Sequence, residues 1–298
     1  MPADFDPRTI AKLKGLVLRA RHIVEGYIAG LHRSPYRGFS IEFAEHREYV
    51  PGDDLRYLDW KVFGRTDKFY LKQFEDETNL IAHLVVDVSE SMNYRGPHCA
   101  MSKLEYAQCL AASMAWLVLQ QQDAVGLTTY DDQLRTQLRP NSQSTHWKTI
   151  LESLERVDAR GKTKPEAVFK ELAARWNKRG VVIIFSDLIT DLEGLLRGLK
   201  QLKFRQHDVA LFQILDPAEL DFPFSGERQF HGLEQLPDLT VNADAIRRGY
   251  QEELNRFLDS VRASCHSLGM DHQLVRTDQP FDQALASYLS RRLARVKP

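Results

Sequence analysis

Three oxygen-bearing side chains follow one apolar run of this 298-residue sequence at intervals of two. Asp87, Ser89 and Ser91 come directly after residues 84–86, which are apolar as in a buried strand. A carboxylate and two hydroxyls are hard oxygen ligands of the kind that Mg²⁺ prefers, and that ion keeps several waters among its roughly six ligands. A vacant position on such an ion accepts a carboxylate from another protein. The spacing therefore indicates half of a metal site, and a binding role rather than a catalytic one.

Two later side chains are placed where they could supply the remaining ligands of this metal site. Asp187 ends a second predicted strand, and Thr163 lies in a loop just before a helix that has Pro165 near its first turn. Ligands of open α/β sheets collect beyond the carboxyl ends of the strands, where neighbouring loops converge. The predicted metal ligands are Asp87, Ser89, Ser91, Thr163 and Asp187.

This set resembles the metal-ion-dependent adhesion site of von Willebrand factor A domains, in which a DxSxS motif, a later Thr and a later Asp hold one divalent cation. The resemblance implies direct contact from Ser89, Ser91 and Thr163, with Asp87 and Asp187 acting largely through waters. It also implies that an acidic residue of a partner protein takes the remaining position. One Mg²⁺ or Mn²⁺ is the expected cofactor, in the chain alone or only with the partner bound.

Two other interpretations of Asp87 stay open. Asp and Ser after a strand often form a turn and cap the next helix, which would leave a metal-free scaffold. Asp87 is also placed like the nucleophile of a Mg²⁺-dependent phosphatase. Phosphatases of the haloacid dehalogenase type carry an acid/base Asp two residues later, and here that residue is Ser89. We therefore expect no enzymatic activity and no catalytic residue.

The elements that must position these side chains form a regular α/β alternation from residue 81 onward. It predicts a doubly wound, mostly parallel sheet covered by helices on both faces. The expected strands are 81–87, 124–130, 180–187, 209–215 and 272–275, with an antiparallel edge partner at 133–138 and one or two short strands after Pro223. The expected helices are 103–120, 145–157, 165–178, 192–203, 243–268 and 281–295, with an amphipathic helix at 7–32.

A long signature precedes the first of these strands. Residues 38–79 read GFSIEFAEHREYVPGDDLRYLDWKVFGRTDKFYLKQFEDETN. The elements EF, R-Y-PGDD-R-DW, R-T and K-FEDE resemble the bacterial domain-of-unknown-function family fifty-eight, and RQFHGLE at 228–234 and TDQPF at 277–281 also fit it. The resemblance implies an adaptor or co-chaperone of a MoxR-type AAA ATPase that matures or remodels protein complexes, with ATP hydrolysis supplied by the partner.

The signature mixes arginines with carboxylates, which predicts a small β-rich region held by paired guanidinium and carboxylate groups. A docking face with Tyr57 and Trp60 as aromatic anchors is the alternative. The expected organisation is an N-terminal helix and this β-rich region in residues 1–80, followed by a von Willebrand factor A-like α/β domain in residues 81–298.

Composition excludes several other classes of protein. Forty basic and forty-one acidic residues give a net charge of −1, so no general attraction to nucleic acid or anionic lipid is expected. The three cysteines, Cys99, Cys109 and Cys265, form no metal or disulfide pattern and are typical of a reducing compartment. No apolar run approaches the ~20 residues that span a bilayer. We therefore expect a soluble, cytoplasmic protein without a membrane span.

Overall fold

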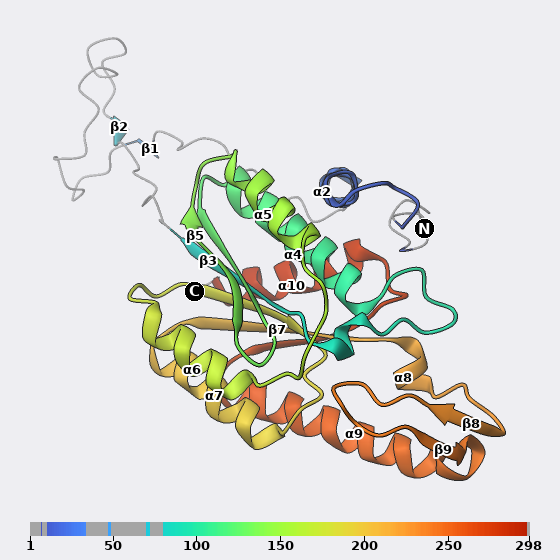
Figure 1. Ribbon diagram of the computed structural model, residues 1–298. Helices are drawn as coiled ribbons and strands as arrows, with labels where there is room; N and C mark the ends of the chain where they lie inside the picture. Colours follow the sequence, from blue (N-terminus) through green and yellow to red (C-terminus); the bar gives the residue numbers. More distant parts are fainter. Residues whose placement is uncertain (1–6, 8–10, 34–46, 49–69, 72–79, 297–298) are drawn as a thin grey trace. The chain divides into compact units, whose positions relative to one another are not determined.

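The computed structural model describes residues 7, 11–33, 47–48, 70–71 and 80–296 (Figure 1). The chain divides into two compact units, one of residues 31–79 and one of residues 1–30 with 80–298. In the first unit the described residues are the end of a helix and the antiparallel pair β1 (Arg47–Glu48) and β2 (Tyr70–Leu71). Most of the signature, Tyr57 and Trp60 included, lies outside the described residues. The predicted boundary between residues 80 and 81 stays a prediction.

A six-stranded sheet forms the centre of the second unit, in the order β10-β7-β6-β3-β4-β5. Every neighbouring pair is parallel except β4 and β5, which are antiparallel at the edge. Its strands are β3 (Ile81–Asp87), β4 (Ala124–Tyr130), β5 (Leu134–Asn141), β6 (Val181–Ser186), β7 (Asp208–Leu215) and β10 (Asp271–Arg276). The predicted mostly parallel sheet is confirmed, as are its antiparallel edge and the inclusion of the last strand.

Helices cover both faces of this sheet (Figure 1). The α-helices of this unit are α2 (Leu16–Arg33, as far as Gly30), α4 (Lys103–Gln120), α5 (His146–Glu155), α6 (Pro165–Arg175), α7 (Leu192–Phe204), α8 (Pro217–Asp221), α9 (Ala243–Ser267) and α10 (Phe281–Val296). Alternate strand residues such as Val85 and Ile184 pack with α6, α7 and α9 in one core cluster. On the opposite face the ring of Phe212 meets Tyr288 of α10. Successive strand residues point to opposite faces, so apolar runs without alternation are buried on both sides.

The N-terminal helix predicted over residues 7–32 is interrupted. Residues 7 and 11 are helical, residues 12–15 form a turn, and α2 begins at Leu16. Gly15 has φ +85°, a left-handed conformation that interrupts a right-handed helix and that glycine adopts without steric cost. The backbone N–H of Leu16 donates to the Glu155 carboxylate at 2.8 Å, which satisfies one of the N–H groups left unpaired at a helix start.

A small antiparallel hairpin separates α8 from α9. It consists of β8 (Glu227–Phe230) and β9 (Leu239–Asn242), as the sequence predicts for the stretch after Pro223. A Cβ atom on Gly232 would lie 2.0 Å from the Leu236 carbonyl oxygen, so the turn has room only for glycine there. The sequence patterns missed α8 and the short 3-10 helix η3 (Glu90–Asn93), which follows β3.

Candidate metal site

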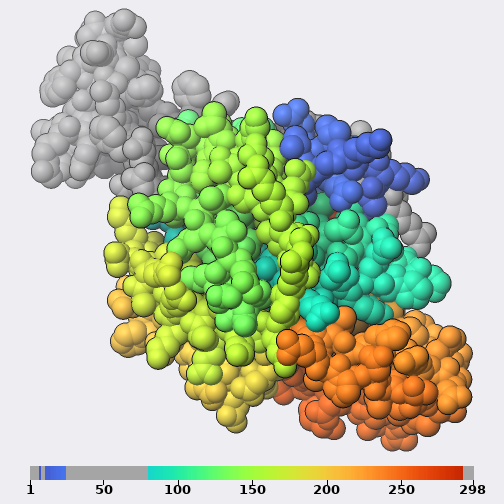
Figure 2. All heavy atoms as spheres, viewed as in Figure 1, coloured from blue at the N-terminus to red at the C-terminus, as the bar shows by residue number. Residues whose placement is uncertain are grey.

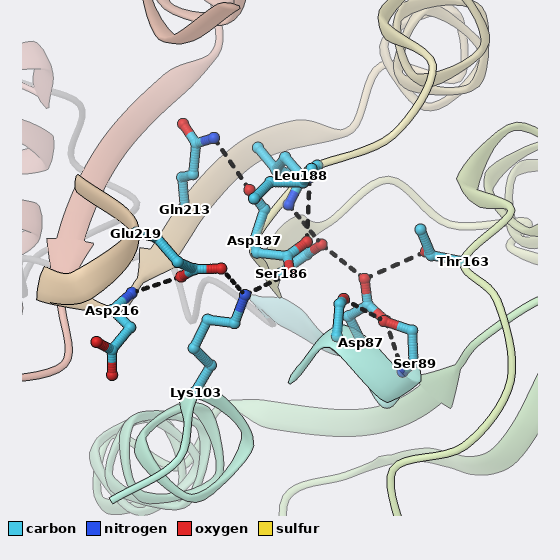
Figure 3. Close-up of polar contacts among 12 residues, drawn as sticks. Asp87, Ser89, Lys103, Thr163, Ser186, Asp187, Leu188, Gln213, Asp216 and Glu219 are labelled. Carbon is cyan, nitrogen blue, oxygen red and sulfur yellow. Dashed lines mark hydrogen bonds and ion pairs between the residues drawn. The ribbon is translucent and has the colours of Figure 1, made fainter. Parts of the chain in front are cut away.

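Two buried carboxylates lie at the carboxyl ends of neighbouring strands (Figure 3). Strands β3 and β6 pair in parallel with Val86 opposite Phe185, so the loops that follow them start side by side. Asp87 ends β3, and Asp187 follows the last residue of β6. Both side chains are completely inaccessible to solvent, with 0% exposure. Burial of two carboxylates so close together needs compensating charge or hydrogen bonds.

Asp87 receives its hydrogen bonds from neutral groups. Its Oδ1 accepts from the backbone N–H of Ser89 at 2.9 Å, and its Oδ2 accepts from the hydroxyls of Ser186 at 2.6 Å and Thr163 at 3.3 Å. The hydroxyls of Ser89 and Ser91 lie 3.1 Å apart. A carboxylate and several hydroxyls from three loops are thus in contact with one another.

Asp187 differs because it has a cationic partner. The Lys103 ammonium lies 2.8 Å from Oδ2 of Asp187 and 2.7 Å from Oε1 of Glu219. Lys103 is the first residue of α4 and is itself buried. Burial opposes its charge, but the two carboxylates outweigh that effect and raise the pKa of Lys103 above its ordinary value. The charge of Asp187 is therefore shared with an internal cation.

Asp87 has no such compensation, and its proton affinity reflects this. Burial, and then the negative charge of Asp187, raise the pKa of Asp87 to about 6 although hydrogen bonds to Ser186 and Ser89 act in the opposite direction. Tyr130 lies opposite Asp87 on β4. Burial, and then the charge of Asp87, raise the pKa of the Tyr130 hydroxyl, which has no hydrogen-bond partner among the described residues.

The loop that carries Thr163 is held by the backbone on both sides. Arg160 N–H donates to the Val88 carbonyl at 2.9 Å, Glu90 N–H donates to the Gly161 carbonyl at 3.0 Å, and Lys164 N–H donates to the Asp131 carbonyl at 3.1 Å. The first two bonds bring a segment about 70 positions away in sequence against the residues that follow β3, and the third ties it to the residue that follows β4. Pro165 then begins α6, as the sequence predicts.

The structure places the predicted residues as follows. Asp87, Ser89, Ser91 and Thr163 form one chain of hydrogen-bonding contacts, and Asp187 lies on the adjacent strand end, close enough for its charge to act on Asp87. The turn alternative is present in part, since Ser89 N–H bonds to Asp87. The capping alternative fails at Ser89, whose side chain makes no capping hydrogen bond to η3.

Sequence reasoning missed four contributors: Lys103, Tyr130, Ser186 and Glu219. One signal was available for Lys103, because a cation in the first turn opposes the helix dipole and implies another source of compensation. Ser186 directly precedes Asp187, so a search for hydroxyls at both strand ends would have included it. Glu219 lies in α8, an element too short for the helical pattern to predict.

The chemistry of this set fits one divalent ion of the Mg²⁺ or Mn²⁺ type. Hydroxyl and carboxylate oxygens are hard ligands, and hydroxyls contribute no charge of their own. The described part of the chain contains no cluster of three or more His, Cys, Asp or Glu that could hold a metal ion, so a Cys/His zinc site is not formed there. The arrangement depends instead on serine and threonine oxygens around two carboxylates.

Comparison with known proteins identifies the family. The family model described as "Protein of unknown function DUF58" matches residues 45–257. The chain belongs to the DUF58 family. Uncharacterised proteins of Mycobacterium bovis and Mycobacterium tuberculosis are 28% identical to it over 295 residues, which is 96% of this DUF58 chain and 90% of each relative.

Among solved structures, the conserved hypothetical protein BatB from Bacteroides thetaiotaomicron is 16% identical, with a TM-score of 0.48 over 71% of this chain and 98% of that one. An aerotolerance-related membrane protein from Bacteroides fragilis is 16% identical, with a TM-score of 0.45 over 71% and 97% of the two chains. None of the described helices of this DUF58 protein is both long enough and apolar enough to cross a membrane.

Proposed function

We propose that this DUF58 protein is a non-enzymatic, metal-dependent module for protein–protein interaction, with a von Willebrand factor A-type fold and metal site. The observation that carries the proposal is the contrast within the pair of buried carboxylates. Asp187 is paired with Lys103, whereas no Lys or Arg in the described ranges pairs with Asp87, around which hydroxyls gather instead. A divalent cation supplies the charge that Asp87 lacks.

The local charges support this assignment. Two carboxylates, Asp187 and Glu219, contact the Lys103 ammonium, and a third, Asp87, lies close enough to Asp187 for their charges to interact, so the excess is negative. Mg²⁺ or Mn²⁺ held by Ser89, Ser91 and Thr163, with the two aspartates acting through waters, neutralises that excess. A coordination position then remains on the ion for one further oxygen ligand.

We propose that the partner supplies this acidic group. The family resemblance indicates a MoxR-type AAA ATPase, or a client of that ATPase, as the partner. The DUF58 chain then acts as an adaptor in the maturation or remodelling of protein complexes. Its metal links two proteins and activates no substrate.

Two features argue against a phosphatase. A nucleophilic carboxylate must reach a phosphorus atom, but Asp87 is buried and already accepts three hydrogen bonds. The position of the acid/base Asp is occupied by Ser89, a side chain that cannot carry the proton.

Isothermal titration with Mg²⁺ and Mn²⁺ tests the metal site. We expect one ion per chain for the wild type and no measurable binding for Asp87→Asn, which preserves shape and removes charge. Asp158→Asn, at an exposed carboxylate, is the control and is expected to bind like the wild type. Circular dichroism spectra establish that each variant is folded. Absence of binding in the wild type, or equal binding by Asp87→Asn, contradicts the proposal and favours the metal-free scaffold.

Purification from native cells tests the partner. A MoxR-type ATPase is expected to co-purify with the wild type in Mg²⁺ and to be lost with a chelator or with Asp87→Asn. Retention under all three conditions excludes a metal-dependent contact.

A further inference from the structure

The β8–β9 hairpin brings an acidic side chain of the protein itself against the candidate metal site. Oε2 of Glu234, in the loop between the two strands, accepts a hydrogen bond from the backbone N–H of Thr163 at 3.2 Å. The N–H of Glu234 donates to Oε2 of Glu90 at 2.6 Å. Thr163 and Glu90 belong to the two loops that supply the hydroxyl ligands. Figure 2 shows the orange hairpin segment in contact with the yellow-green loop that precedes α6.

The second carboxylate oxygen of Glu234 lacks a partner. Its Oε1 is buried and makes no hydrogen bond within the part of the chain that the structure describes. An ionised oxygen removed from water without a hydrogen bond or counter-charge is strongly unfavourable. A cation bound beside Oε1 removes this cost and gives the site a further acidic contact.

The loop is held in a conformation that presents Glu234. Glu234 and Gln235 have φ of +55° and +64°, in the left-handed region that residues with a Cβ seldom adopt. Such a conformation persists only where neighbouring contacts fix it. Asp238 supplies some of them, because its carboxylate accepts from Gly232 N–H at 3.1 Å and lies 2.9 Å from Nδ1 of His231. Leu236 N–H also donates to the Leu233 carbonyl across the turn at 3.0 Å, and Glu234 is further held by its bonds to Thr163 and Glu90.

We propose that Glu234 is the protein's own acidic ligand for the ion, so that the hairpin holds the position that a partner's carboxylate takes. This inference rests on the proposed function. The protein alone is then in a self-occupied state, and a partner must displace the Glu234 carboxylate before it contacts the metal. The apparent affinity for an acidic partner is lowered by the fraction of chains in which Glu234 is bound.

Manganese alone is a sufficient probe of this proposal. We expect Glu234→Gln to weaken Mn²⁺ binding about tenfold and to increase the water-proton relaxation caused by bound Mn²⁺, because a water replaces the lost carboxylate oxygen. Acetate is expected to reduce that relaxation in Glu234→Gln and to leave the wild type unchanged. Glu227→Gln, at an exposed carboxylate of the same hairpin, is the matched control and is expected to behave like the wild type.

Two results overturn the proposal in distinguishable ways. If Glu234→Gln binds Mn²⁺ with wild-type affinity and hydration while Asp87→Asn does not bind, the metal site stands and Glu234 is not its ligand. If the folded wild type binds no Mn²⁺, the proposed function and the internal ligand fail together. Should Glu234→Gln prove unfolded by circular dichroism, Glu234→Asp provides the test, since it keeps the charge but shortens the reach. Wild-type affinity and hydration in that variant count against direct ligation, and a loss supports it.

Discussion

Titratable side chains are buried at both ends of the central sheet, but the groups that surround them differ. At the carboxyl end, Asp87 and Asp187 are surrounded by hydroxyls and by the Lys103 ammonium. Toward the amino end, His83 stacks on Trp176 with ring centroids 3.9 Å apart, and its edge meets His207 at 6.1 Å. The first group combines opposite charges with oxygen ligands, whereas the second is a cluster of rings.

The buried histidines at the amino end of the sheet act as packing residues. Burial, and then the charge of His207, lower the pKa of His83 to about 4, so the ring is neutral at physiological pH. His207 accepts a hydrogen bond at Nδ1 from Gly180 N–H at 3.2 Å. A perturbed pKa therefore does not by itself indicate a functional site. At the carboxyl end the additional evidence is the convergence of neutral oxygen donors on a carboxylate without a cation.

The largest expected effect is at the carboxyl end. Lys103→Met keeps most of the side-chain volume but leaves Asp187 and Glu219 buried without their cation. We expect a loss of about 3–5 kcal/mol in the free energy of unfolding, measured by urea denaturation in the presence of a chelator. Adding Glu219→Gln to Lys103→Met is expected to restore part of the loss. A loss below about 1 kcal/mol contradicts the idea that Lys103 compensates these carboxylates.

The next largest effect concerns the amino end and depends on pH. The folded-state pKa of His83, about 4, lies below the unfolded value of about 6.5, so the unfolded chain binds the proton more readily. Its contribution is complete above pH 6.5 and is lost as the pH falls towards 4. The difference corresponds to about 3 kcal/mol.

His83→Phe keeps a ring against Trp176 and removes the titration. We expect its unfolding free energy, measured by urea denaturation between pH 7 and pH 4, to fall less than that of the wild type by about this amount. Asp87 changes stability in the opposite direction over part of this range, because its folded pKa is raised, but it does so equally in both proteins. His98→Asn, at an exposed histidine, is the control. Parallel pH profiles for wild type and His83→Phe would show that His83 is not the source.

A smaller effect is expected at Thr163, where it tests whether the hydroxyl is a metal ligand or only stabilises the fold. Thr163→Val keeps the shape of the side chain and removes the hydroxyl that donates to Asp87. We expect a loss of about 1 kcal/mol in unfolding free energy and about a tenfold weaker affinity for Mg²⁺, measured by titration calorimetry. Thr163→Ser retains the hydroxyl and is expected to bind like the wild type. Equal Mg²⁺ affinities for Thr163→Val and Thr163→Ser would remove Thr163 from the ligand set.

The smallest expected change in stability is at Ser91. Its hydroxyl contacts that of Ser89 and is not bonded to Asp87. Ser91→Ala is expected to alter the free energy of unfolding by no more than about 0.5 kcal/mol while reducing Mg²⁺ affinity about tenfold. Stability measured by urea denaturation and affinity measured by calorimetry thus change independently. Loss of stability without loss of affinity would assign Ser91 to the turn alone.

Much of the fold was already determined by the sequence. Strands such as Ile81–Asp87 and Ala124–Tyr130 were predicted to the residue, because short runs rich in apolar and β-branched residues specify strands buried on both faces. The positions of Asp87 and Asp187 at strand ends followed from the same pattern. Local interruptions were harder to predict, since the left-handed backbone of Gly15 interrupts a helix whose apolar periodicity continues through it.

Tertiary structure alone decided which charges meet. Lys103 and Asp187 are 84 positions apart, and Glu234 and Thr163 are 71 apart, so no local pattern links either pair. The sheet order places β6 beside β3, and the packing brings α4 and α8 to the same end of the sheet. This packing pairs Asp187 with the buried Lys103 and leaves Asp87 among hydroxyls. The sequence supplied the oxygen ligands, and the fold determined the electrostatic difference between the two carboxylates, because that difference depends on burial and distance in space.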